Sequence, residues 1–274
     1  MSTTPDIVNE ISKHGKSESG HAINASTFEQ LISYCTGYGA IYNPSKNGIK
    51  VASMNALLTS ARTAITNEED KHNAYSIAVD NREMLFNPLS NFITKILNAL
   101  KSSEVTKQKI DDAKTYTRKL SGKRAKNKSK KALDAFVSAT TKDLSTTDTT
   151  VIPSLEQEHK EISVSQMSYD NRYDNLSKLV NLLSTEPGYA PNETELKITS
   201  LNTLLSTMKT KNSAVINSIT ALSNARIERN KILYKDDTGL YDIAMFTKAY
   251  VKSVFGYKSP EYKQVSKLRF TKPR

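Results

Sequence analysis

The chain has 274 residues, of which 39 are Lys or Arg and 28 are Asp or Glu, so its formal charge is +11 at neutral pH. With 9 Gly, 8 Pro and no Trp, the composition favours long helices joined by few turns over many short strands. A single cysteine, Cys35, excludes an intramolecular disulfide framework and a multi-cysteine metal site, and we interpret it as a half-buried apolar residue.

Residues 1–25 are expected to form an N-terminal arm. This region has no apolar segment behind a basic start, so no secretory signal is predicted. Nowhere does the chain contain the roughly 18 consecutive apolar residues of a transmembrane helix. We therefore expect a cytoplasmic protein without a transmembrane segment, and export by a signal-free route stays open.

The first predicted helical unit covers residues 26–116. Ser26 and Glu29 have the spacing of a capping box, which predicts that a short helix begins there. A turn at Tyr42 leads into a helix of about 40 residues, with an apolar seam whose positions alternate three and four apart. The seam positions are Val51, Met54, Leu58, Ala61, Ile65, Glu68, His72, Tyr75, Val79, Arg82 and Phe86. Further helices are predicted at about 89–102 and after Ser103.

Residues 117–152 are predicted to connect this unit to a second one. The connection opens with fourteen residues, 118–131, that contain no acidic residue and are followed by a Thr-rich polar stretch. The cations of this basic segment are Arg118, Lys119, Lys123, Arg124, Lys126, Lys128, Lys130 and Lys131.

The second predicted unit, residues 153–270, repeats the first. Residues 42–58 (YNPSKNGIKVASMNALL) align without gaps on residues 189–205 (YAPNETELKITSLNTLL), with seven of the seventeen positions identical. The offset drifts from 147 to about 155 downstream, which indicates a duplication of a helical unit. Copy two is expected to have a longer first helix, from Pro153 through Leu183.

Copy two also contains a second long helix and two further helices. The seam of the long helix runs through Ile198, Leu201, Leu205, Met208, Asn212, Val215, Ile219, Leu222, Arg226, Arg229 and Leu233. A helix is predicted at about 240–255. The last one begins where Ser259 has the properties of an N-cap and Pro260 those of the first helical residue.

The basic segment is the strongest candidate site, because its cations suit an anion or nucleic acid whose counterions they displace. No aromatic residue lies within it to stack on bases, so an exposed charged helix end is the preferred interpretation.

Several positions of the two seams have ionisable side chains. Glu68 and His72 are four residues apart, a spacing that suits a shared proton or a metal ion. No third ligand is evident, so we prefer to interpret this stretch as facing solvent or pairing with a basic helix.

Arg82 and Arg229 occupy matching places near the ends of the long helices. They could together bind one acidic ligand, or each could be a helix-end cation that bonds nearby carbonyls.

Residues 241–257 are the most apolar stretch of the chain. We interpret them as a core helix, and the alternative is insertion at a membrane interface.

The phrases YAPNETELK (189–197), LSNARIERNKILY (222–234) and FITKILNALKSS (92–103) resemble a tandem-duplicated helical protein family of Bacteroidota bacteria. The resemblance implies a bacterial origin and a helical fold. That family has no assigned activity, so no functional residue is carried over.

The sequence therefore predicts an all-α, elongated, coiled-coil-like bundle of two pseudo-symmetric tandem units with one long helix each. Because no catalytic motif is evident, we expect a non-enzymatic structural, scaffolding or protein-interaction protein without a cofactor. A protein partner or self-association is the expected mode. The alternatives are a nucleic-acid-associated protein that uses residues 118–131 and a membrane-active, toxin-like protein.

The nucleic-acid alternative predicts a strong salt dependence. Binding of the full chain to a labelled RNA or DNA duplex should weaken by more than tenfold between 50 and 200 mM salt, in proportion to the phosphates neutralised. Neutralising Lys126, Lys128, Lys130 and Lys131 to Gln should reduce the salt slope in a fluorescence anisotropy titration. Affinity that stays unchanged in both tests would exclude this alternative.

Overall fold

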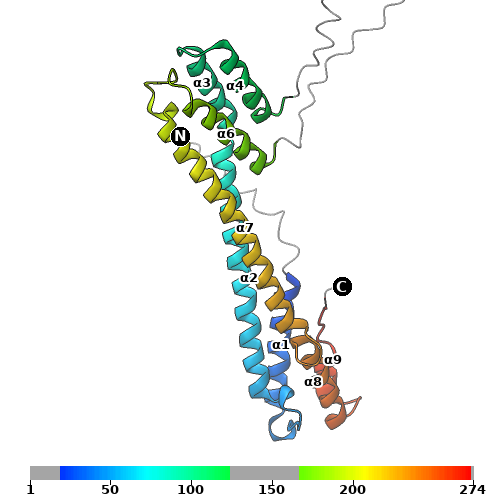
Figure 1. The fold of residues 1–274 in the computed structure, drawn as a ribbon. Helices are drawn as coiled ribbons and strands as arrows, with labels where there is room; N and C mark the ends of the chain where they lie inside the picture. Colours follow the sequence, from blue (N-terminus) through cyan, green and yellow to red (C-terminus); the bar gives the residue numbers. More distant parts are fainter. Residues whose placement is uncertain (1–18, 124–166, 273–274) are drawn as a thin grey trace, which may run out of the picture. The chain divides into compact units, whose positions relative to one another are not determined.

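The computed structural model describes residues 19–123 and 167–272 (Figure 1). All regular elements within these ranges are α-helices or short 3₁₀-helices, which confirms the predicted all-α class. The two long helices are α2 (Val51–Phe86) and α7 (Ile198–Tyr234). Their lengths, 36 and 37 residues, agree with the prediction from the uninterrupted seams.

The chain forms two compact units. Unit 1 combines Met1–Ile77 with Ile216–Arg274, and unit 2 consists of Ala78–Val215. Helix α2 therefore begins in unit 1 and ends in unit 2, whereas α7 begins in unit 2 and ends in unit 1. Each predicted repeat is therefore divided between the units, and each unit contains the first helices of one predicted repeat and the last helices of the other.

Unit 1 is built by α1 (Ser19–Gly37), the first part of α2, the last part of α7, α8 (Leu240–Phe255) and α9 (Pro260–Ser266). Helix α1 packs on α8 and α9, and α8 also contacts the 3₁₀-helix η2 (Asn47–Ile49). Each large apolar side chain buried in this core contributes about 1.5–3 kcal/mol. The core includes Phe28, Leu31, Met54, Leu233, Leu240, Ala244 and Val251.

The C-terminal segment is tied to α1 in unit 1. The Asn24 side-chain amide donates to the Thr271 carbonyl at 2.7 Å, and the Thr271 amide donates back to Asn24 Oδ1 at 3.0 Å. Asn24 is fully buried, so both ends of its amide need these partners.

Unit 2 is built by the end of α2, α3 (Leu89–Lys101), α4 (Lys107–Leu120), α6 (Tyr169–Ser184) and the first part of α7. Helix α4 packs on α3 and α6, and α3 contacts the 3₁₀-helix η4 (Thr194–Leu196). Gly188 allows its backbone to lie against the α3–α4 loop, because a Cβ there would be 2.3 Å from the Glu104 carbonyl oxygen. The core includes Phe86, Ile93, Ile96, Leu100, Leu176, Leu183 and Leu201.

The turns before the two long helices contain the same hydrogen bond. The Tyr42 hydroxyl donates to the Ile49 carbonyl at 2.6 Å, and the Tyr189 hydroxyl donates to the Leu196 carbonyl at 3.0 Å. Each bond closes a loop around a 3₁₀-turn, and α2 or α7 begins two residues later. Burial, with the nearby Glu193 carboxylate as a second cause, raises the pKa of Tyr189 to about 12, so its phenol stays a donor.

Two predicted helix starts have different outcomes. Ser259 caps α9 by accepting from the Tyr262 amide, with Pro260 at the first helical position, as predicted. The capping box at Ser26 is wrong, because α1 already begins at Ser19 and Ser26 lies inside it. Glu29 instead forms an ion pair with Arg62 on α2.

The prediction of a longer first helix in copy two is also wrong, at the centre of that helix. Ser168 accepts from the Asn171 amide as an N-cap, so α6 begins at Tyr169 rather than continuing an earlier helix. The hydroxyl competes for the backbone amide that a continuous helix would use. Residues 153–166 of that prediction lie outside the described ranges.

Half of the predicted seam of α7 is buried along its whole length. Leu201, Met208, Val215, Leu222 and Arg229, spaced seven apart, are all buried. On the other half, the side chain of Ile219 is exposed, although Leu205 and Asn212 before it are buried. In unit 1 the packed face of α7 includes Ala225 and the partly buried Ile232, which lie on the flank of the helix away from Ile219.

Within the described ranges, no helix combines the length and the apolar character that crossing a bilayer requires.

The turn hydrogen bonds make a stability prediction. Tyr42→Phe and Tyr189→Phe should each lower the free energy of unfolding by about 1–2 kcal/mol, because a buried carbonyl loses its donor. Tyr257→Phe, at a largely exposed residue, is the matched control and should change it by less than about 0.5 kcal/mol. Urea denaturation followed by circular dichroism measures all three. Equal stabilities would show that these bonds do not hold the turns.

Candidate functional site

The most buried charged group in unit 1 is the Glu68 carboxylate on α2, whose side chain is 2% exposed. Its Oε2 lies 2.9 Å from Arg229 Nη1, and its Oε1 lies 2.7 Å from Arg226 Nε. Both arginines are on α7. Of the interpretations drawn from the sequence, pairing with a basic helix is therefore confirmed for Glu68, and a solvent-facing position is wrong.

The two arginines are not equivalent partners. Arg229 is buried and also donates to the Asn230 side-chain oxygen, whereas the Arg226 side chain is 48% exposed. A buried ion pair is stable only if both members keep their hydrogen bonds, and removing one leaves an uncompensated charge. Glu68 and Arg229 thus depend on each other, and Arg229 bonds an acidic group rather than helix-end carbonyls.

A histidine lies beside this pair. His21 on α1 shares a 2.7 Å hydrogen bond between its Nδ1 and the Tyr234 hydroxyl, and the Asn24 amide donates to the same hydroxyl at 3.2 Å. Burial, followed by the positive charge of Arg229, lowers the pKa of His21, and the Glu68 charge opposes this. The imidazole is therefore neutral near pH 7 and serves as a hydrogen-bonding partner of Tyr234.

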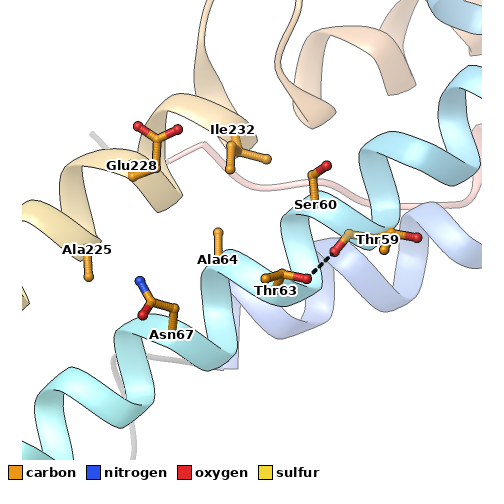
Figure 2. Close-up of a pocket in the computed structure, with 8 residues that line it drawn as sticks. All are labelled: Thr59, Ser60, Thr63, Ala64, Asn67, Ala225, Glu228 and Ile232. Carbon is orange, nitrogen blue, oxygen red and sulfur yellow. Dashed lines mark hydrogen bonds between the residues drawn. The ribbon is translucent and has the colours of Figure 1, made fainter.

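An open pocket lies between α2 and α7 in unit 1 (Figure 2). The hydroxyls of Thr59, Ser60 and Thr63 face it but donate to carbonyls of their own helix four residues earlier. These donors are already engaged, so the pocket presents mainly small and apolar surface. Its lining residues are Thr59, Ser60, Thr63, Ala64, Asn67, Ala225, Glu228 and Ile232.

A second cluster of charged and aromatic side chains lies in unit 2. The Arg82 guanidinium carbon is 3.9 Å from the ring centroid of Tyr169, and the Arg172 guanidinium carbon is 5.3 Å from that of Phe86. The rings of Phe86 and Tyr169 meet edge to face at 4.9 Å. Arg172 also donates to the Phe86 carbonyl. We call these four residues the arginine–aromatic cluster.

The proposed clamp of one ligand by Arg82 and Arg229 has no support from these contacts. The two side chains belong to different units and have different partners. Neither alternative considered from the sequence describes the two arginines, since Arg229 pairs with Glu68 and Arg82 contacts the ring of Tyr169.

The basic segment is only partly described. Arg118 and Lys119 lie in the last turn of α4, and Arg118 donates to the Lys123 carbonyl at the helix end. This local contact fits the charged helix end considered from the sequence. Arg124, Lys126, Lys128, Lys130 and Lys131 lie outside the described ranges.

The remaining sequence candidates have simpler surroundings. His72 is exposed on α2, while Glu68 four residues earlier is buried. In the described ranges, no group of three or more His, Cys, Asp or Glu side chains is placed to hold a metal ion. Cys35 is fully buried, not half-buried, and burial raises the pKa of its thiol to about 11, which fits an apolar core residue.

Sequence reasoning missed Arg172, Tyr169 and His21. The only available signal was the repeat itself, in which His21 aligns on Tyr169 and Asn24 on Arg172 at an offset of 148. Neither position has a local motif.

No known family model, curated protein or solved structure matches this chain. The family resemblance described above therefore stays a prediction.

The buried ion pair makes the second stability prediction. Glu68→Ala should lower the free energy of unfolding by about 3 kcal/mol, because Arg229 then keeps a buried charge without a partner. Glu69→Ala changes the same residue type at the next, exposed position and should cost less than about 0.5 kcal/mol. Urea denaturation of both variants gives the difference. Similar costs for the two would mean that the pair contributes little to folding.

Proposed function

We propose that this protein is a non-enzymatic structural or scaffolding protein, built from a duplicated helical unit, that binds a protein partner. Matched contacts support the duplication. Besides the turn hydrogen bonds of Tyr42 and Tyr189, the ring pair His21–Tyr234 in unit 1 corresponds to Tyr169–Phe86 in unit 2 at the offset of 148.

The observation that carries the binding proposal is a row of exposed isoleucines on the unit 1 part of α7. Ile216, Ile219 and Ile227 are 60%, 47% and 62% exposed. At 100° per residue they lie within about 80° of one another around the helix. Single exposed apolar residues are ordinary, but an aligned group on one helix is typical of a binding face. We call it the isoleucine stripe.

Charge indicates the kind of partner. The three Lys or Arg residues of the unit 1 part of α7 form ion pairs with Glu68 or Glu228, so the excess positive charge is that of the whole chain, which is +11. A positively charged surface attracts an acidic partner and accelerates its association. We therefore assign to the isoleucine stripe an amphipathic helix of a partner protein, with apolar residues on one face and acidic residues beside them.

A pair of designed peptides tests this function. A labelled amphipathic helical peptide with leucines flanked by glutamates should bind the full chain in fluorescence anisotropy, and the same peptide with lysines in place of the glutamates should not. The double variant Ile216→Asp/Ile227→Asp should bind the acidic peptide at least tenfold more weakly, equivalent to about 1.4 kcal/mol.

The matched control is Ile23→Asp/Ile41→Asp, which makes the same change at two exposed isoleucines outside the stripe and should bind normally. Equal loss in both double variants, or equal binding of the two peptides, would contradict the assignment. Stripe-dependent binding to anionic lipid vesicles without peptide binding would replace the protein partner with a membrane surface.

A further inference from the structure

The arginine–aromatic cluster of unit 2 contains two positive groups that contact no carboxylate among the residues that the structure describes. Arg82 contacts the face of Tyr169, and Arg172 contacts Phe86 and its carbonyl. The Nε atoms of both arginines are buried without a hydrogen-bond partner. The acidic residues next to the cluster in the sequence, Glu83 and Asp170, are both exposed, and Asp170 accepts from Asn212. An unpaired, partly buried guanidinium costs free energy that an anion would recover.

At the corresponding position of unit 1, a carboxylate of the chain itself pairs with the arginine. Arg229, which aligns on Arg82 at an offset of 147, is held by the Glu68 carboxylate at 2.9 Å. The residue that aligns on Glu68 is Val215, which has no charge. Asn24 of unit 1 aligns on Arg172, and Arg226 aligns on Val79, so each unit has two arginines at this place but only unit 1 has a carboxylate.

Burial lowers the pKa of Arg172, with the Tyr169 phenol as the opposing influence, and this agrees with the absence of an acidic group from its described surroundings. Because the guanidinium stays charged at any physiological pH, only a counter-ion relieves this cost. The planar fork of an arginine is matched by a carboxylate, which accepts two parallel hydrogen bonds.

We propose that the arginine–aromatic cluster is a binding site for a carboxylate, in which Arg82 and Arg172 take the ligand that Glu68 supplies internally in unit 1. The carboxylate comes from a small organic acid or from an acidic side chain of a bound protein. The inference rests on the duplication proposed above and not on the isoleucine stripe.

The test is a titration of the full chain, labelled with ¹⁵N-arginine, with succinate at constant ionic strength and with chloride as the reference salt. The side-chain N–H resonances of Arg82 and Arg172 should shift and saturate, whereas those of the exposed Arg62 in unit 1 should not. Arg82→Gln and Arg172→Gln should each weaken succinate binding at least tenfold, and Arg62→Gln should leave it unchanged.

A further variant adds a carboxylate to the chain itself. Val215→Glu places a carboxylate where Glu68 stands in unit 1 and should abolish succinate binding, while the neutral Val215→Gln should retain it. If both Val215 variants unfold, the two Arg→Gln variants still decide the result. Shifts that do not saturate, or that match those with chloride, overturn the proposal.

Two further arms identify the ligand. A glutamate-containing peptide that binds tighter than succinate at this site assigns the carboxylate to a protein partner, and the reverse assigns it to a small acid. Tighter binding of inorganic phosphate than of either overturns the choice of a carboxylate. The double variant Ile216→Asp/Ile227→Asp should bind succinate normally. The proposal for the isoleucine stripe and the proposal for this site can therefore fail independently of each other.

Discussion

Helices α2 and α7 each contribute to two hydrophobic cores, and this constraint governs most of the structure. An α-helix is one continuous ladder of backbone hydrogen bonds, so the face that it buries in one core fixes the positions available for the other. Phe86 at the end of α2 is buried in the core of unit 2, while Met54 near its start is buried in that of unit 1. Leu201 and Leu233 show the same division for α7. Neither unit is therefore formed by one sequence repeat alone.

The ion pair of Glu68 with Arg229 sets a specific alignment of α2 and α7 within unit 1. Apolar seams tolerate sliding by a turn, because one leucine replaces another at small cost. A buried carboxylate is satisfied only opposite its arginines. Glu68 and Arg229, which looked like exceptions in the apolar seams, are therefore structural in unit 1. In unit 2 the corresponding residue is Val215, which provides no carboxylate for Arg82 and Arg172. The two units therefore differ in charge at this position.

Much of the local structure could be predicted from the sequence. The bounds of α3 and α8 agree with those predicted, and the start of α9 follows from a local signal, Ser259 with Pro260, which acts within one turn of a helix. The start of α1 could not be predicted, because Ser26 and Glu29 have the spacing of a cap and yet lie inside a helix. His21 and Asn24 of α1 bond Tyr234 more than two hundred residues away, which no local motif indicates.

The sequence by itself determined the helical class and the two long helices, because composition and apolar periodicity act through neighbouring residues. Tertiary structure alone decided which residues meet. Arg82 and Arg229 look alike in the sequence, but one contacts Tyr169 and the other Glu68, because each is completed by a segment from the other repeat. The exposure of Ile219 was likewise decided by packing, which buries the opposite flank of α7 in unit 1. Periodicity specifies an apolar face, but only the neighbouring helices determine which part of that face is covered.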